Sequence, residues 1–322
     1  MSGTRQATGP PRPDRTTTPP ATAAPNRPTR PVTAVAYPHS RFAPVAGVEV
    51  HHEVHGPIDA PAVLLSHHFY GSTRTWRHVT ADLADDHRAV AFDRPGFGLT
   101  ERPARTGRRT AEVSPYRRTT AARIGWGLLD HLDVDRAVLI GSSAGGTNVL
   151  EMYRRQPDRV RALVLLSPAI TGDVGPPGPL RRPLRSAPAR AAGAGLVRRL
   201  ARDVDVERIS RSWFDPQRAT PEDAEPYQRM LRVDGWDQGL WDAITAERPP
   251  DLRDVVRSVD VPTLVVTGDH DRVVAPHLSR ATAEAIPDAR FVVIEDCGHT
   301  PQEERPAALL AVVRDFLDEL PT

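Results

Sequence analysis

Residues 137–146 read Ala-Val-Leu-Ile-Gly-Ser-Ser-Ala-Gly-Gly, an apolar run that passes directly into the pattern Gly-x-Ser-x-Gly with Ser143 at its centre. A continuous apolar run of this length is typical of a strand that is buried on both faces. Downstream of the pattern, Val149 and Met152 recur at helical spacing, and Pro157 stands where a helix is expected to end. The stretch therefore predicts a buried strand, a sharp turn at Ser143 and a helix.

A sharp strand-to-helix turn is a place at which a serine can serve as a nucleophile. A serine hydroxyl is a poor nucleophile at neutral pH, so it must be held where a base can reach its oxygen. Small residues on either side allow the backbone to turn without clashes. At ordinary abundances of glycine and serine, about one chain in ten of this length contains the pattern by chance. The flanking strand and helix favour a nucleophilic Ser143 over a plain glycine-rich turn.

The composition excludes several classes of function. The chain has 322 residues, and its 42 basic residues balance 41 acidic ones, so it lacks the basic field that binds nucleic acid. All of the basic residues are arginine, which excludes a Schiff-base lysine and a phosphate-binding P-loop lysine. The single Cys297 excludes an internal disulfide and a cysteine zinc site, and it fits a reducing compartment.

The first forty residues differ in composition from the rest of the chain. They contain nine prolines together with many threonines, arginines and alanines, and we expect them to be disordered. They lack the apolar core of a secretory signal, and no run of about 18 apolar residues that could span a membrane follows. We therefore expect a cytoplasmic protein whose tail, residues 1–40, is either without function or a docking segment.

From about Arg41 onward, apolar runs alternate with segments of helical length. Six near-continuous apolar runs are found, at residues 62–65, 89–92, 138–140, 162–166, 263–266 and 291–294. This alternation predicts a parallel sheet that is covered by helices on both faces. Nearly one hundred residues without a strand pattern separate Leu166 from Thr263, and we interpret them as an inserted, mostly helical segment.

The inserted segment has two compositional peculiarities. It holds aromatic residues that either fasten a small helical subdomain to the core or line a pocket, namely Trp213, Phe214, Tyr227, Trp236 and Trp241. Of these, Trp213 and Trp236 are candidate substrate contacts. Residues 174–202 also contain seven arginines and no acidic residue. This arginine patch is either a solvated helix face or an entrance that steers an anionic substrate or touches a membrane surface.

Three histidines lie in or beside the alternating run of residues 48–54, a run that is typical of an edge hairpin strand. His51, His52 and His55 suggest a metal site at first sight. Neighbouring residues of a strand face opposite sides, however, so His51 and His52 cannot easily bind one ion. We therefore interpret the three as surface histidines of the strand and expect no metal.

Two polar loops follow the last two apolar runs and supply partners for a nucleophile. The first reads Thr-Gly-Asp-His-Asp-Arg and contains Asp269 and Asp271, and the second contains His299. A serine nucleophile needs a base that takes its proton and an acid that orients this base. Because open α/β sheets build their sites at the carboxyl ends of the strands, we expect Ser143, an aspartate and His299 to lie together.

These features together resemble the α/β-hydrolase superfamily over about residues 41–320. The resemblance rests on the Ser143 turn, the aspartate loop, the Gly298-His299 ending and the run Asp93-Arg94-Pro95-Gly96-Phe97-Gly98. The order serine, aspartate, histidine along the chain is also that of this superfamily. The resemblance implies a mostly parallel eight-stranded sheet with helices on both faces and an inserted helical cap. It further implies Asp271, rather than its competitor Asp269, as the orienting acid.

A serine nucleophile also needs hydrogen-bond donors for the oxyanion. One is expected to be the backbone N–H of Ala144, which follows Ser143 at the start of a helix. Relatives in the superfamily usually have His-Gly-x after the first of the six runs, with x supplying the second N–H; by position, x is Phe69. This chain departs from that pattern, because His68 stands in place of the glycine and Tyr70 follows. His68 and Tyr70 either are tolerated substitutions packed against the cap or contact the substrate, with a role in specificity or proton transfer.

The sequence thus predicts a serine hydrolase that acts on a carboxylic ester, lactone or thioester of a small molecule. Residues 41–170 and 256–322 are expected to form the core, and residues 171–255 are expected to form the cap. No cofactor, nucleic acid partner or transmembrane segment is expected, and the oligomeric state is not predicted.

Other reactions use the same parts and stay open. Relatives with a small cap include cofactor-free perhydrolases, also described as haloperoxidases, and hydrolases that cleave carbon–carbon bonds of diketones. A binding protein that has kept this fold without its chemistry is the alternative from another class.

Overall fold

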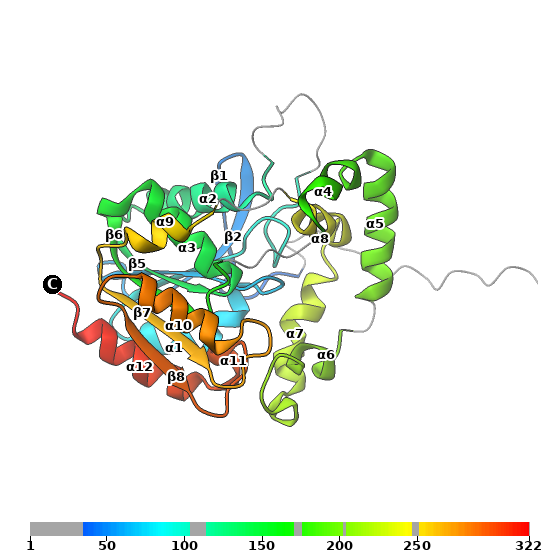
Figure 1. Cartoon of the computed structure of the whole chain (residues 1–322). Helices are drawn as coiled ribbons and strands as arrows, with labels where there is room; N and C mark the ends of the chain where they lie inside the picture. The colour runs from blue at the N-terminus through cyan, green and yellow to red at the C-terminus, as the bar shows by residue number, and fades with distance from the viewer. Residues whose placement is uncertain (1–34, 104–113, 171–175, 202–203, 247–250, 322) are drawn as a thin grey trace, which may run out of the picture.

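The computed structural model describes residues 35–103, 114–170, 176–201, 204–246 and 251–321. At its centre is one sheet of eight strands in the order β1-β2-β4-β3-β5-β6-β7-β8 (Figure 1). The strands are β1 (Arg41–Val45), β2 (Val48–His55), β3 (Ala62–Ser66), β4 (Arg88–Phe92), β5 (Ala137–Ser142), β6 (Val160–Leu166), β7 (Thr263–Gly268) and β8 (Arg290–Ile294). β1 and β2 pair antiparallel with their neighbours, and the remaining pairings are parallel. The predicted mostly parallel eight-stranded sheet is confirmed.

Helices cover both faces of the sheet, because its inner strands are buried on both faces. β3 and β4 are buried along their whole length, as their continuous apolar runs predict. One face is covered by α2 (Arg118–His131), α3 (Ala144–Arg155), α9 (Arg253–Arg257) and α10 (Pro276–Ala285). The other face is covered by α1 (Arg77–Leu83) and α12 (Pro306–Asp318). Shorter elements complete the core: η2 (Thr73–Trp76), η3 (Pro157–Arg159) and α11 (Pro301–Glu304).

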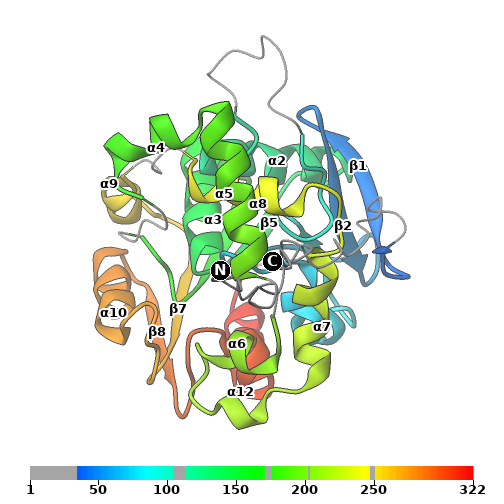
Figure 2. The same cartoon turned by 90° about the vertical axis from the view of Figure 1, so that its right-hand side faces the viewer.

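Among the described residues, five helices and a short 3₁₀ turn form a segment that is inserted between β6 and α9. They are α4 (Gly178–Leu184), α5 (Ala187–Leu200), α6 (Val206–Ser210), η4 (Pro216–Arg218), α7 (Pro221–Met230) and α8 (Trp236–Ile244). Figures 1 and 2 show these inserted helices beside the sheet, outside the two layers that cover its faces. They have a small apolar core in which Val197 of α5 packs with Trp236 and Leu240 of α8. Within the ranges given above, no helix is long and apolar enough to cross a bilayer.

The segment before β1 differs from the prediction. Residues 1–34 lie outside the described part of the chain, but residues 35–40 are placed, although the sequence assigned them to a disordered tail. Val35 is buried in a small apolar cluster, and the Tyr37 hydroxyl donates to Glu225 of α7 at 3.1 Å. These contacts bury apolar surface of residues 35–40, and this burial explains why they are ordered although the composition of the tail predicts disorder.

The interpretation of surface histidines on β2 is wrong for His51 and His52, whose side chains are buried. β2 is not an edge strand, since it pairs with β1 on one side and with β4 on the other. Both of its edges are therefore paired, and of the three histidines only His55, at the end of the strand, is half-buried.

Candidate active site

Ser143 forms the sharp turn between β5 and α3. Its backbone has φ of +53° and ψ of −114°, a conformation that is rare for a residue with a side chain. The Ser143 N–H donates to the carbonyl of Leu166 at 2.8 Å, which fastens the turn to the end of β6. Gly145 permits the turn, because a Cβ there would overlap the carbonyl of Ser66. The predicted strand, turn and helix are all present, and Ser143 lies at the carboxyl edge of the sheet.

His299 and Asp271 meet between the loops that follow β7 and β8. His299 Nδ1 lies 2.8 Å from Asp271 Oδ2 and 3.0 Å from Oδ1. The same carboxylate accepts hydrogen bonds from the N–H groups of Val273 and Val274 at 2.8 and 2.9 Å. Burial raises the pKa of Asp271, but the hydrogen bond and charge of His299 outweigh it, so this pKa lies below its ordinary value. An ionised Asp271 therefore holds the imidazole with Nδ1–H toward the carboxylate.

Asp269, the competitor in the same loop, has other partners. It accepts from the Cys297 N–H at 3.0 Å, and it pairs with the exposed His270 at 2.8 Å. The geometry thus favours Asp271 as the residue that orients His299. With Nδ1 turned to Asp271, the Nε2 edge of His299 is left for the cavity that His299 and Ser143 both line.

The inserted segment also holds the loop that carries His299. The His299 N–H donates to the carbonyl of Ser212 at 2.8 Å. The buried Glu304 carboxylate accepts from two backbone N–H groups of the inserted segment, at 2.7 and 3.1 Å, and from the Gly298 N–H at 2.6 Å. Glu304 therefore joins the inserted segment to the residue that precedes His299.

A cavity of about 490 Å³ lies between the carboxyl edge of the sheet and the inserted helices. Five of the predicted site residues line it: His68, Phe69, Tyr70, Ser143 and His299. The inserted segment contributes mostly aliphatic side chains, among them Val197, Val204, Ile209, Leu240 and Ile244. The cavity is large enough for a small-molecule substrate and brings an apolar wall close to Ser143.

Two predicted substrate contacts are not among the residues that line this cavity. Trp236 packs into the apolar core of the inserted helices, and the backbone of Trp213 packs directly against Gly298. Aromatic enrichment alone does not distinguish packing from pocket lining, and the structure does not place these two residues at the cavity. Sequence reasoning missed Glu303 as a lining residue and named Tyr227 only as one of the aromatics of the insertion.

The loop after β3 is held by the carbonyl of His68. This oxygen accepts from His67 Nδ1 at 2.7 Å, from Arg94 Nη2 at 2.9 Å and from the Gly71 N–H at 3.1 Å. The C=O and N–H of one trans peptide point in opposite directions. The Phe69 N–H, which belongs to the same peptide, therefore points away from these three donors, and Phe69 itself lines the cavity.

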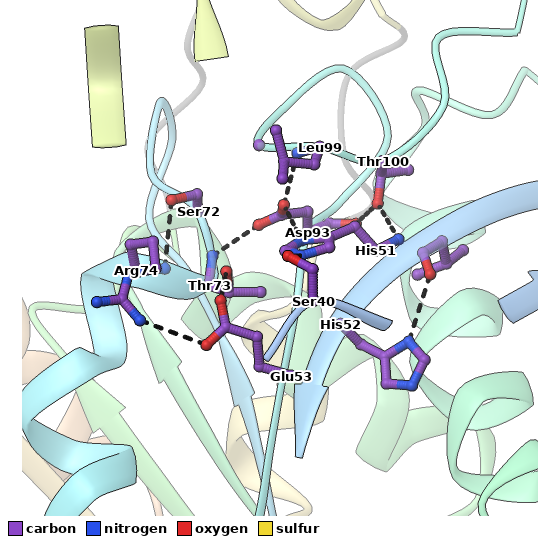
Figure 3. A network of polar contacts seen from close by, with 12 residues as sticks. Ser40, His51, His52, Glu53, Ser72, Thr73, Arg74, Asp93, Leu99 and Thr100 are labelled. Carbon is purple, nitrogen blue, oxygen red and sulfur yellow. Dashed lines mark hydrogen bonds and ion pairs between the residues drawn. The ribbon is translucent and has the colours of Figure 1, made fainter. Parts of the chain in front are cut away.

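Asp93, directly after β4, contacts the start of η2, which follows that loop, and also β2 and its own loop, as Figure 3 shows. Its carboxylate accepts from the N–H groups of Thr73 and Leu99, both at 2.6 Å, and contacts His51 Nδ1 at 2.6 Å. The other ring nitrogen of His51 lies 2.6 Å from Ser40 Oγ. This chain of contacts resembles a catalytic triad in its residue types: Ser40, His51 and Asp93. None of the three lines the cavity. We assign this network to the support of the loop.

Comparison with known proteins gives similarity to hydrolases along most of the chain. A family model described as "alpha/beta hydrolase fold" matches residues 61–306. A 2-hydroxymuconate semialdehyde hydrolase from Pseudomonas sp. (strain CF600) is 30% identical over 254 residues, which cover 76% of this chain and 81% of that protein. A thermophilic esterase from Thermogutta terrifontis is 27% identical, with a TM-score of 0.69 over 88% of this chain and 99% of that chain. The enol-lactonase from Burkholderia xenovorans LB400 is 28% identical, with a TM-score of 0.65 over 87% and 100%.

Proposed function

This chain belongs to the α/β-hydrolase family, and we propose that it is a serine hydrolase that cleaves a carboxylic ester, lactone or thioester of a small molecule. One observation carries the proposal. Ser143 forms a strained turn and lines the same cavity as His299. The Nδ1 atom of His299 contacts the buried carboxylate of Asp271. These are the relations that nucleophile, base and orienting acid require.

In the proposed reaction, Ser143 Oγ attacks the carbonyl carbon of the ester while His299 Nε2 takes the hydroxyl proton. Asp271 keeps Nδ1 protonated and stabilises the imidazolium that forms. His299 then gives the proton to the departing alcohol, and the acyl group stays on Ser143. A water molecule, deprotonated by His299, attacks the acyl-serine, releases the acid and restores Ser143.

The proposal assigns the oxyanion to the backbone N–H groups of Ala144 and Phe69. Ala144 is the first residue of α3, so its N–H has no acceptor within the helix and lies at the positive end of the helix dipole. The Phe69 N–H is turned away from the donors that hold the His68 carbonyl. Removal of one such donor from an oxyanion hole lowers kcat by about 10² to 10³.

The same proposal makes the inserted helices α4 to α8 the cap of the site. The division predicted from the sequence is a cap of residues 171–255 on a core of residues 41–170 and 256–322, but α9 packs on the sheet and belongs to the core, so the cap ends before Leu252. Side chains of α5 and α8 close the cavity over Ser143, and Glu304 fastens the inserted segment to the His299 loop. We propose that the protein acts in the cytoplasm on a small-molecule ester.

Labelling and turnover of a Ser143→Ala variant test the proposal. The wild-type protein is expected to react with a fluorophosphonate and to hydrolyse p-nitrophenyl butanoate, whereas the variant is not labelled and its kcat falls by at least about 10⁴. Ser142→Ala, at the neighbouring buried serine, is the matched control and retains both properties. Equal turnover by Ser143→Ala contradicts the mechanism, and a folded wild-type protein that resists labelling favours a non-catalytic binding protein.

Cleavage of a carbon–carbon bond in a diketone is the second candidate, because the Pseudomonas relative is named for a semialdehyde substrate of this kind. A kcat/KM for 2-hydroxymuconate semialdehyde that exceeds the value for p-nitrophenyl butanoate by about a hundredfold would favour this candidate. Peroxide-dependent oxidation of a halide-linked dye, measured with the same protein, tests the perhydrolase alternative.

A further inference from the structure

The wall of the cavity is divided between apolar and polar side chains. Val197, Leu240 and Ile244 of the inserted helices form an aliphatic part. Arg208, Ser212 and Thr300 also line the cavity. Three further polar residues of the wall contact one another: His68 from the loop after β3, Tyr227 from α7 and Glu303 from α11. We call these three residues the polar cluster.

The members of the polar cluster contact one another. The Tyr227 hydroxyl lies 3.1 Å from both carboxylate oxygens of Glu303 and 3.3 Å from His68 Nε2. His68 Nε2 also lies 3.3 Å from Glu303 Oε2. These distances are at the long end of the range for hydrogen bonds, so a ligand can replace them at low cost.

The position of the protons follows from the acceptors. His68 Nδ1 lies 2.8 Å from the Phe69 carbonyl, which can only accept, so Nδ1 carries a proton. With a neutral ring, Nε2 is an acceptor for the Tyr227 hydroxyl; with a doubly protonated ring, Nε2 donates to Glu303. Burial and the charge of Glu303 raise the pKa of Tyr227 well above its ordinary value, so its hydroxyl stays a donor. The polar cluster therefore offers both donors and acceptors.

The charge of the polar cluster limits what it can bind. Arg77 Nη1 lies 3.8 Å from Glu303 Oε1, but the other end of this guanidinium is paired with Asp223. Glu303 therefore has no full counter-charge from Arg77, and a second carboxylate beside it is disfavoured. A hydroxyl group, which is uncharged and both donates and accepts, matches the polar cluster better than an anion does.

We propose that His68, Tyr227 and Glu303 form a subsite for an uncharged hydroxyl group of the substrate. The preferred substrates are then esters whose aliphatic part lies against the inserted helices and whose hydroxyl lies at the polar cluster. This inference rests on the proposed function, since the cavity is the one that Ser143 lines.

Two pairs of esters that differ by one hydroxyl test the subsite. The first pair is p-nitrophenyl butanoate and p-nitrophenyl β-hydroxybutanoate, with the hydroxyl on the acyl side. The second pair is propyl butanoate and 3-hydroxypropyl butanoate, with the hydroxyl on the alcohol side, and its turnover is followed by acid release. The wild-type enzyme is expected to prefer the hydroxylated ester of at least one pair. In Tyr227→Phe and in Glu303→Gln, this preference in kcat/KM falls by about tenfold or more.

A matched control separates recognition from attachment of the inserted helices to the core. Tyr37→Phe removes another tyrosine-to-glutamate hydrogen bond to α7, also of 3.1 Å, outside the cavity. It should leave the preference between the esters of each pair unchanged. If kcat/KM falls by the same factor for both esters of a pair in Tyr227→Phe and Glu303→Gln, the subsite is overturned. A wild-type enzyme that has no preference in either pair overturns it as well.

The two proposals fail in different ways. Turnover that survives in Ser143→Ala removes the proposed mechanism. Loss of turnover in Ser143→Ala, together with an unchanged preference in Tyr227→Phe and Glu303→Gln, removes the subsite alone.

Discussion

Asp271 and Asp269 stand two positions apart on one loop, and only Asp271 contacts His299. Asp271→Asn replaces a charged acceptor by an amide that cannot hold Nδ1–H and stabilise the imidazolium equally well. We expect kcat to fall by about 10³ to 10⁴ in Asp271→Asn and by less than about fivefold in Asp269→Asn. Steady-state hydrolysis of p-nitrophenyl butanoate by both variants measures the difference. The reverse order of the two effects contradicts the assignment of the acid.

Buried histidines make the stability of this protein depend on pH. Burial lowers the pKa of His52 to about 4, whereas a histidine in an unfolded chain has a pKa of about 6.5. Between these values the unfolded chain binds a proton that the folded chain does not, so stability is lost as the pH falls. For His52 the loss reaches up to about 3 kcal/mol near pH 4. His67, whose pKa burial also lowers, adds a loss of the same sign.

Urea unfolding between pH 7 and about pH 4.5 measures this dependence. We expect His52→Gln to reduce the slope of the unfolding free energy with pH, although His67 keeps part of it. His39→Gln, at an exposed histidine, is the control and should keep the wild-type slope. An unchanged slope in His52→Gln would show that folding does not lower the pKa of this residue.

Some site residues were predictable and others were not, for a physical reason. Ser143, Asp271 and His299 directly follow strands, and strand ends of a parallel sheet converge, so the sequence places them together. Tyr227 lies on an inserted helix and Glu303 beyond the histidine loop, where no such rule holds. His68 was recognisable only as a departure from a family pattern, and its partners became known from the structure.

At the scale of elements, two arginines of the predicted arginine patch join α5 to α8. Arg190 binds Asp242 through two bonds of 2.8 and 2.5 Å, and Arg198 pairs with Asp237. Both aspartates are buried, so these pairs support the packing of the two helices. The interpretation as a solvated face or an entrance is therefore incomplete for Arg190 and Arg198, while Arg202 lies outside the described residues.

The contact between α5 and α8 also requires glycine at position 193. Gly193 faces the indole of Trp241, and a Cβ at this position would overlap the ring. Gly193→Ala is therefore expected to push α5 away from α8 and to lower the unfolding free energy by about 1–3 kcal/mol. It should also raise KM, because Val197 and Leu240 of these helices line the cavity.

Gly195 provides the matched control on the same helix. A Cβ at Gly195 meets nothing within 4 Å, so Gly195→Ala gains helix propensity without a clash. We expect it to stabilise the protein by about 0.5–1 kcal/mol. Denaturant unfolding of both variants measures the change in unfolding free energy. The changes should have opposite signs for Gly193→Ala and Gly195→Ala, and changes of the same sign would contradict the packing against Trp241.

The strands were predictable from the sequence and the inserted helices only in outline. Each of the six apolar runs became a strand of the sheet, and the first five are buried on both faces, as continuous apolar residues favour. The sixth, β8, lies at the edge of the sheet and keeps Val293 exposed. The inserted helices bury only one side against one another, and their pairing depends on long-range contacts such as Gly193 with Trp241. Patterns along the chain do not contain that information.

At the scale of the whole molecule, polar contacts join the core to the inserted segment near the proposed active site. Arg77, the first residue of α1, pairs with Asp223 of α7. Glu304 accepts backbone N–H groups of the inserted segment and of the loop that carries His299. These contacts couple the position of the inserted segment to the position of His299, whose own N–H donates to Ser212. Changes at the junction should therefore alter stability and catalysis together.

Glu304→Gln tests this coupling. The buried carboxylate accepts three backbone N–H groups, and an amide in its place directs N–H donors at some of them. We expect a loss of about 2–4 kcal/mol in unfolding free energy and a fall in kcat/KM at temperatures where the variant is fully folded. Glu284→Gln, at an exposed glutamate of α10, is the control for the same substitution. His299 is held at Nδ1 by Asp271 and at its backbone N–H by the carbonyl of Ser212. If Glu304→Gln is destabilised but keeps the wild-type kcat/KM, the contact with Asp271 alone positions His299, and the proposed coupling is contradicted.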